Sequence, residues 1–386
     1  LGDFYEMFFE DAKTASRELE LTLTGKDCGM EERAPMCGVP YHAVEGYLSR
    51  LVQKGYKVAI AEQMEDPKLA KGLVKREVIR VVTPGTNLNV QSLEAGKNNY
   101  LLSIAYTSDG IGISAADVTT GDYYVTEVED LKKLNDELMK YEPSEIICNE
   151  AFLVSGFDVN DLKSRLHISV NALESHMFDD DGCRRILMKH FKVNTLIGLG
   201  VEEFPTGLLA AGALLQYLYD TQKTDLEHFT HIYPYLTSKY MLLDSSTRRN
   251  LELTETLREK QKRGSLLWVL DKTKTAMGAR LLRNYIEQPL IEKDEMEKRL
   301  DAIQELNQDS ISRDEIREYL NPIYDLERLL SKVTYKTANP RDLIAFRNSL
   351  QMLPPIKTVL SAFEKEELTE IREQIDGLED IYQLID

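Results

Sequence analysis

Residues 2–6 read Gly2-Asp3-Phe4-Tyr5-Glu6, and this stretch permits two local structures with different consequences. In the first, it starts a helix: Asp3 is the N-cap, Glu6 completes a capping box, and apolar residues follow at helical spacing. In the second, it is extended. Phe4 and Glu6 then share a face, because side chains two residues apart lie on the same side of a strand but diverge on a helix. The sequence leaves both interpretations open.

Short strands and a helix are predicted after this stretch. Apolar residues at helical spacing predict a helix over Val44–Val52. Runs that alternate or are rich in β-branched residues predict strands at Leu21–Thr24, Lys57–Ala61 and Val78–Val82. The turn signal at 83–86 and the polar stretch 87–99 then predict a linker.

An antiparallel meander is predicted to open the next region. Turns rich in Thr, Ser, Asp and Gly join three strand-like runs, Tyr100–Tyr106, Gly112–Asp117 and Asp122–Val128. A helix over Leu131–Tyr141 and a buried strand over Glu145–Cys148 follow. This order predicts an α/β layer.

Helix signals dominate from about Pro205 onward. Leu208–Tyr219 is apolar with small residues, which predicts a helix packed closely on its neighbours. Ser265 and Thr275 each precede an apolar helical run and are expected to be N-caps, and Pro289 is expected to stop the second run. Charged helices continue to the last residue without a closing element, so we expect an incomplete helical unit.

Charge and length constrain the class of protein. The 386 residues predict about two to four domains. The formal net charge of −18 divides into −3 over residues 1–95, −11 over 96–232 and −4 over 233–386. The negative net charge of the whole chain argues against a nucleic-acid partner, because phosphate binding normally needs a surplus of Lys and Arg. Local basic patches can override that objection.

Two basic runs interrupt the acidity. Ten Lys and Arg residues lie between Arg248 and Arg283, a pattern typical of interaction or ion-pair surfaces. In the N-terminal region, five cations surround Glu77, and either a solvated face or phosphate contact explains them. These five cations are Lys68, Lys71, Lys75, Arg76 and Arg80.

Metal, disulfide and membrane signals are weak. The four cysteines form no CxxC pair, which favours a reducing compartment, and Cys28, Cys37 and His42 are too loosely spaced to predict zinc. The longest apolar run, 208–215, is far short of the ~20 residues that cross a bilayer. The start at Leu1, without Met or a signal segment, predicts a trimmed fragment.

Catalytic signals are also few. Gly25-Lys26 and Gly96-Lys97 lack the rest of a phosphate-binding loop, so we expect no ATPase site. Asp117 and Asp122 flank a predicted hairpin turn, where paired carboxylates could hold metals for a nuclease, although such residues are far commoner as turn formers. The nuclease stays an alternative.

Several strings, in the same order along essentially the whole chain, resemble the MutS family of bacterial DNA mismatch-repair proteins. They are Gly2-Asp3-Phe4-Tyr5-Glu6, Pro35-Met36-Cys37-Gly38-Val39-Pro40-Tyr41-His42, Asp66-Pro67, Val81-Val82-Thr83-Pro84-Gly85-Thr86, Thr247-Arg248-Arg249-Asn250-Leu251-Glu252 and Met277-Gly278-Ala279-Arg280-Leu281-Leu282.

This resemblance implies an α/β plus all-α architecture. Residues 1–89 are expected to form a mixed α/β mismatch-recognition domain, 98–226 a ribonuclease H-like connector domain, and 227–386 the first part of an all-helical core that leads into levers. The family's residues before Leu1, its clamp and its ATP- and Mg-binding domain are missing from this pattern. We therefore expect no cofactor, no catalytic residue and no metal in this chain.

The resemblance also implies partners. They are mismatched double-stranded DNA, the protein MutL and, for the complete protein, a second copy, while the fragment alone is expected to be monomeric. The expected location is the bacterial cytoplasm, associated with the nucleoid and not with a membrane. The connector's −11 suits a basic protein patch better than DNA, so a purely protein-docking role is a further alternative.

The family's F-x-E motif falls on Phe4 and Glu6. An apolar ring inserted from the minor groove unstacks a base step, and a mismatched step is easier to unstack and kink. We expect Phe4 to supply that wedge. We expect Glu6 to hydrogen-bond the displaced base and, as an anion, to repel matched duplex. Met36 is predicted to flank the wedge, and Arg76 to contact a backbone phosphate.

Overall fold

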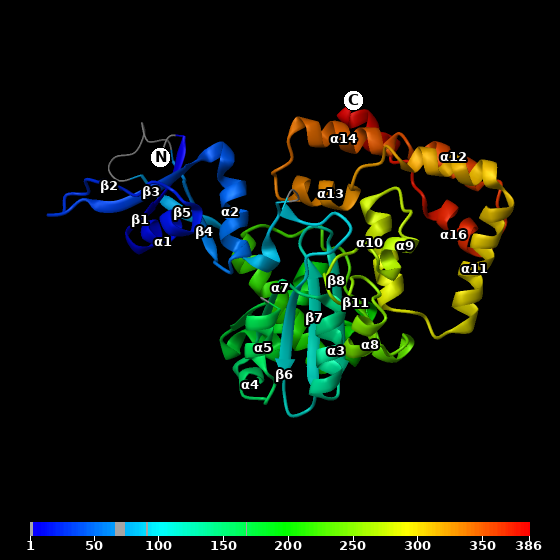
Figure 1. Cartoon of the computed structure of the whole chain (residues 1–386), viewed down its shortest axis with the longest axis horizontal. Helices are drawn as coiled ribbons and strands as arrows, with labels where there is room; N and C mark the ends of the chain where they lie inside the picture. The colour runs from blue at the N-terminus through cyan, green and yellow to red at the C-terminus, as the bar shows by residue number, and fades with distance from the viewer. Residues whose placement is uncertain (1–2, 66–73, 90–91, 167) are drawn as a thin grey trace.

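The computed structural model describes residues 3–65, 74–89, 92–166 and 168–386. Figure 1 shows three regions: the blue N-terminal unit lies to one side, a cyan and green unit built on a sheet lies at the centre, and yellow to red helices arch beside it. Among the described residues, no helix combines the length and the apolar character needed to cross a membrane. Predictions on Gly2, Asp66, Pro67, Lys68 and Lys71 fall outside the described residues.

The N-terminal unit contains a three-stranded antiparallel sheet in the order β1-β3-β2 and a two-stranded sheet of β4 and β5. Its elements are β1 (Phe4–Phe8), α1 (Phe9–Leu19), β2 (Thr24–Lys26), β3 (Ala34–Pro40), α2 (Val44–Gln53), β4 (Val58–Gln63) and β5 (Arg76–Val82). Helix α2 and strands β4 and β5 confirm the predicted helix and the last two predicted strands.

The helical interpretation of residues 3–6 is wrong. Residues 4–8 form strand β1, and the helix begins only at Phe9. Pairing with β3 decides this, because the strand buries Tyr5 and Met7 against the helices of the unit, and this burial overrides a local capping pattern.

The predicted strand Leu21–Thr24 is also displaced. The strand that forms there is β2, over Thr24–Lys26. Helix α1 ends with Glu20 in the left-handed conformation, and the backbone N–H of Leu21 donates to the carbonyl of Ser16. Leu21 therefore belongs to the helix cap, and pairing starts later.

The central unit is a six-stranded sheet in the order β10-β9-β6-β7-β8-β11. Its strands are β6 (Leu101–Tyr106), β7 (Ile111–Asp117), β8 (Asp122–Val128), β9 (Glu145–Cys148), β10 (Ser169–Ala172) and β11 (Tyr233–Pro234). The first three form the predicted antiparallel meander, and β9 and β10 run parallel to β6. This mixed sheet is the expected ribonuclease H-like arrangement.

Helices cover both faces of this sheet. Leu102 and Ile104 pack on the side of α3 (Leu131–Tyr141), α4 (Glu150–Leu153) and α5 (Val159–Arg165), whereas Leu101 packs on the side of α6 (Asp180–Phe191) and α7 (Pro205–Gln222). Burial on both faces explains why the strands read as nearly continuous apolar runs.

The remaining elements are helices. They are α8 (Ser245–Asn250), α9 (Leu266–Leu270), α10 (Ala276–Glu287), α11 (Lys293–Gln308), α12 (Ser310–Leu320), α13 (Leu326–Thr334), α14 (Pro340–Leu350), α15 (Leu353–Leu360), α16 (Glu366–Gln374) and α17 (Glu379–Ile385). The side chains of Ser265 and Thr275 cap α9 and α10 as predicted, and α10 ends two residues before Pro289.

Two arginines of the helical unit hold the segment predicted to be a linker. Arg328, 1% exposed, donates from Nη2 to the carbonyls of Glu94 (3.2 Å) and Lys97 (2.8 Å). Arg280 donates to the carbonyl of Ala95 (2.9 Å) and forms a bidentate pair with Asp325 at 2.7 Å. The described end of this segment is therefore a joint between the units that two buried arginines hold.

We expect Arg328→Met to weaken this joint. The change leaves two carbonyls without their donor, which costs about 2–4 kcal/mol of unfolding free energy for a buried charged donor. Calorimetry should show the loss, and limited proteolysis should cut faster within residues 92–99. Arg313→Met is the control, because Arg313 bonds only near-surface neighbours on α12 and α11. Equal cutting rates in the two variants would contradict the claim that Arg328 holds this segment in place.

Candidate nucleic-acid interface

One face of the three-stranded sheet carries the predicted motif. The register pairs Phe4 with Pro40, Glu6 with Gly38 and Phe8 with Met36. Directly paired residues point to the same side of a sheet, as do residues two apart on one strand. Phe4, Glu6, Phe8 and Met36 therefore share one face, which we call the F-x-E face. The extended interpretation of residues 4–6 is confirmed.

Gly38 gives this face its shape. A Cβ atom built on Gly38 would lie 3.7 Å from Cδ1 of Phe4 and 3.9 Å from Cγ of Glu6. The two side chains, two residues apart on β1, thus converge over the glycine. Phe4 remains 49% exposed, so its ring is accessible to a partner on this face.

The opposite side of β1 anchors it. Met7 packs in the cluster that contains Ala12 and Ala15 of α1. The hydroxyl of Tyr5 donates to the carboxylate of Glu62 on β4, and burial together with this hydrogen bond raises the pKa of Tyr5 to about 12. Strand β1 is therefore held from within while the F-x-E face stays accessible.

Lys26, a residue outside the predicted site, lies beside Glu6. Nζ of Lys26, on β2, is 2.7 Å from Oε2 of Glu6 and 5.5 Å from the ring centroid of Phe8. In the sequence, Lys26 stood out only as half of an incomplete phosphate loop. Its proximity depends on the pairing of β2 with β3, which has no local signature over such short strands.

The two other predicted contact residues lie at different distances from the motif. Met36 is half-buried on β3, paired with Phe8 on one side and with Thr24 on the other. Arg76 is exposed at the start of β5, in the second sheet. It lines, with Glu6, Phe8 and Lys26, a mainly apolar cavity of about 570 Å³.

Two of the three described cations of the first basic run form ion pairs with acidic residues of the chain. Lys75 pairs with Glu77, and Arg80 pairs with Glu45 at 3.2 Å. Arg76 is exposed at the start of β5 and lines the same cavity as Glu6 and Lys26. Among the described residues, Lys26 and Arg76 are the cations that line the cavity next to Glu6.

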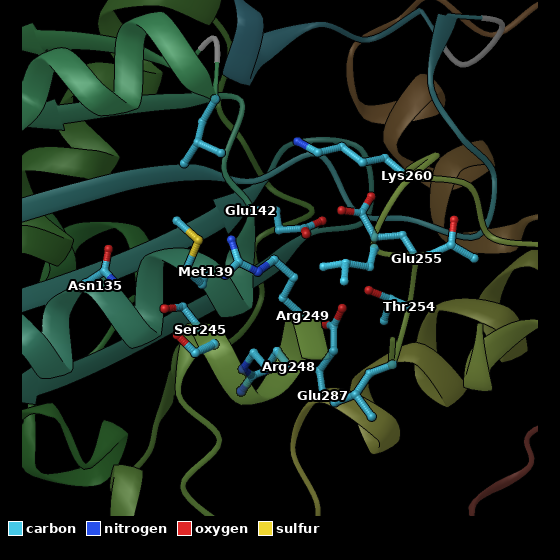
Figure 2. A pocket seen from close by; sticks show the side chains of 15 residues that line it. Asn135, Met139, Glu142, Ser245, Arg248, Arg249, Thr254, Glu255, Lys260 and Glu287 are labelled. Carbon is cyan, nitrogen blue, oxygen red and sulfur yellow. The ribbon is translucent and has the colours of Figure 1, made fainter. Parts of the chain in front are cut away.

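The second basic run is mostly exposed: Arg280 is buried, Arg248 and Arg283 are partly buried, and the other seven cations of the run lie at the surface. Some of its members line a cavity of about 430 Å³. Figure 2 shows acidic and basic side chains around this cavity, from the end of α3, from α8, from the loop that follows α8 and from α10. Burial raises the pKa of Glu287 there to about 7, although Arg283 nearby opposes the shift. The charged residues lining it are Arg248, Arg249, Lys260, Glu142, Glu255 and Glu287. This balance fits an ion-pair surface between units.

The two connector carboxylates are engaged by the chain itself. The Asn98 side chain donates to Oδ2 of Asp117 (3.0 Å) and to Oδ2 of Asp122 (2.8 Å). Asp117 is fully buried and also accepts from Thr119. Burial and the neighbouring Asp117 raise the pKa of Asp122 to about 6.

This network occupies the oxygens that a nuclease would offer to metal ions. No group of three or more potential metal ligands occurs among the described residues. The arrangement therefore disfavours the nuclease alternative and supports a structural role for Asp117 and Asp122 at the linker joint.

Family models of three successive domains match the chain. MutS domain I matches residues 1–91, MutS domain II matches 99–230 and MutS domain III matches 246–386. The boundaries predicted at 89, 98 and 226 remain predictions.

Three similar curated proteins each carry the name "DNA mismatch repair protein MutS". Those from Lachnoclostridium phytofermentans, Ruminiclostridium cellulolyticum and Caldanaerobacter subterraneus subsp. tengcongensis are 65%, 51% and 50% identical over all of this chain. The chain spans 41% of the length of the first and 44% of the other two.

A larger residue at position 38 should disturb the F-x-E face. In Gly38→Leu, atoms beyond Cβ would enter the space of Phe4 and Glu6, and Cβ itself would lie 3.2 Å from the carbonyl oxygen of Tyr5. We expect a loss of about 1–3 kcal/mol in unfolding free energy, as for overpacked sites. Gly46→Ala is the control, since its Cβ would meet nothing within 4 Å. Equal stability of the two variants would contradict the close approach.

Proposed function

The chain belongs to the MutS family of DNA mismatch repair proteins, and on this premise we propose that it recognises mispaired or unpaired bases in double-stranded DNA through Phe4 and Glu6. The observation that carries the proposal is the convergence of these two side chains over Gly38 on one accessible face.

Phe4 is proposed to be the wedge. Inserting an apolar ring between base steps costs a few kcal/mol of unstacking, and this cost is lowest where pairing is already defective. An exposed ring on a strand that is anchored from behind can enter the minor groove without rearranging its own backbone. Binding then depends on how easily the DNA step deforms, without a need to read each base in turn.

Glu6 is proposed to provide discrimination. A carboxylate oxygen can accept a hydrogen bond from a displaced base, and such charge-assisted hydrogen bonds are stronger than neutral ones. Against a matched duplex, no base edge compensates for the repulsion between the carboxylate and the phosphates. Met36, on the same face, is proposed to flank the wedge, and Arg76 to contact a phosphate at the edge.

The acidity of the whole chain is compatible with this function. The unit that carries the F-x-E face has a net charge of only −3, and most of the net charge of −18 lies in the central region. Weak general attraction limits binding to matched DNA, which every phosphate contact would otherwise favour. The −11 of the central region favours docking of a basic protein surface, which we propose for MutL.

Further proposals follow from the family. The complete protein is proposed to work as a homodimer in the bacterial cytoplasm and to hydrolyse ATP with Mg through a domain that these 386 residues do not include. The sequence contains no GxxxxGK[ST] string, so its residues do not fit a nucleotide of that kind. We propose that this chain binds DNA and has no catalytic activity of its own.

Replacing the wedge should abolish mismatch preference. We expect Phe4→Ala to lower affinity for a G·T duplex by about tenfold or more, the scale of a lost base–aromatic contact, with little change for matched duplex. Glu6→Gln should instead raise affinity for matched duplex. Band-shift titrations would use this chain and a chimera that carries it in place of the matching region of the L. phytofermentans relative. Normal G·T preference in Phe4→Ala would refute the wedge assignment.

The nuclease alternative has its own test. We expect no cleavage of labelled duplex or RNA–DNA hybrid when the chain is incubated with Mg²⁺ or Mn²⁺, because its own groups already occupy the two carboxylates. Gel analysis of the products checks this. Cleavage that disappears in Asp117→Asn would instead establish a metal-dependent nuclease.

A further inference from the structure

Glu6, the residue proposed to touch the displaced base, is held by a second residue. We propose that Lys26 is a positioning residue that sets mismatch specificity by orienting the Glu6 carboxylate. This inference rests on the proposed function of Glu6 and adds a residue to it. It starts from the 2.7 Å contact between Nζ of Lys26 and Oε2 of Glu6.

The pair lies in a partly desolvated setting. The Lys26 side chain is 36% exposed and that of Glu6 is 16% exposed. Charge pairs that are partly removed from water are screened less than fully exposed pairs, so this contact can hold one rotamer of each side chain. The ring of Phe8 beneath Nζ adds a second contact to the ammonium group.

The contact gives the two carboxylate oxygens of Glu6 different roles. Lys26 engages Oε2, which leaves Oε1 to accept a hydrogen bond from a base. A carboxylate that is already oriented loses less conformational freedom when the base arrives. Without the lysine, Glu6 would rotate freely and would be pushed away from the phosphates.

The sheet explains why this lysine reaches Glu6. Lys26 is paired with Ala34, and Glu6 with Gly38, on opposite sides of β3. The side chain must therefore cross the middle strand on the F-x-E face. Its four-carbon stem reaches far enough for Nζ to come within 2.7 Å of the Glu6 carboxylate.

A lysine near DNA could also act only as a phosphate contact, and the two roles differ in what they change. A phosphate contact lowers affinity for all sequences nearly equally, whereas a positioning residue changes the ratio of mismatched to matched affinity. It must also act through Glu6. The effect of Lys26 on that ratio should then vanish once the Glu6 carboxylate is removed.

A double-mutant cycle on the dissociation constants for G·T and matched duplexes tests this role. We expect Lys26→Met to lower the affinity ratio by about threefold to tenfold, a usual coupling for contacting charged groups. Glu6→Gln should lower it by itself, and the double variant should equal Glu6→Gln. Lys26→Arg, which keeps the ion pair, should retain the wild-type ratio.

Two controls separate charge loss from positioning. Lys13→Met removes a lysine of the same unit that pairs with Glu10 on α1, away from the F-x-E face, and should leave the ratio unchanged. Arg76→Met, at the proposed phosphate contact, should weaken both duplexes alike. Thermal unfolding of every variant, together with Lys26→Arg, shows whether a lost ratio reflects misfolding.

Different results would refute the positioning role of Lys26 and the proposed function of Phe4 and Glu6. An unchanged ratio in Lys26→Met, or effects of Lys26→Met and Glu6→Gln that multiply, would refute the positioning role while leaving the function of Phe4 and Glu6 intact. If Phe4→Ala and Glu6→Gln both keep the wild-type ratio, the proposed function itself fails, and the role of Lys26 fails with it.

Discussion

The antiparallel pairing of β1 with β3 in a single register decides what the N-terminal unit presents to its surroundings. A slip of one residue would reverse every side chain of β1, burying Phe4 and Glu6 and exposing Tyr5 and Met7. The core contacts of Met7 and the hydrogen bond from Tyr5 to Glu62 make that slip costly. The gap over Gly38 and the reach of Lys26 to Glu6 depend on the same register.

Local sequence patterns predicted the central and helical units better than the N-terminal one. The meander of β6, β7 and β8 has turns between long apolar runs, and the caps at Ser265 and Thr275 act within a few residues. The stretch Asp3 to Glu6 fits a helix-capping pattern, which its spacing favours, but it also fits a strand. Only β3, about thirty residues later, selects between them, and no local propensity contains that information.

The same reasoning explains which parts of the candidate site could be found from sequence. Phe4, Glu6 and Met36 belong to strings that mark the family, so their choice needed no structure. Lys26 lies in a three-residue edge strand with no motif, and only the strand order brings it to Glu6. The joint at Arg280 and Arg328 was missed for a similar reason: a polar stretch predicts a linker, but not the buried arginines that hold its carbonyls.

Phe4 is proposed to enter the base stack at a defective step. Fluorescence of 2-aminopurine placed beside a G·T mismatch measures this directly, because the base is quenched while stacked and brightens when it is unstacked. We expect the fluorescence to rise when the wild-type protein binds. We expect no rise with Phe4→Ala at a concentration that saturates binding, and none on matched duplex. An equal rise with Phe4→Ala would contradict this role of Phe4.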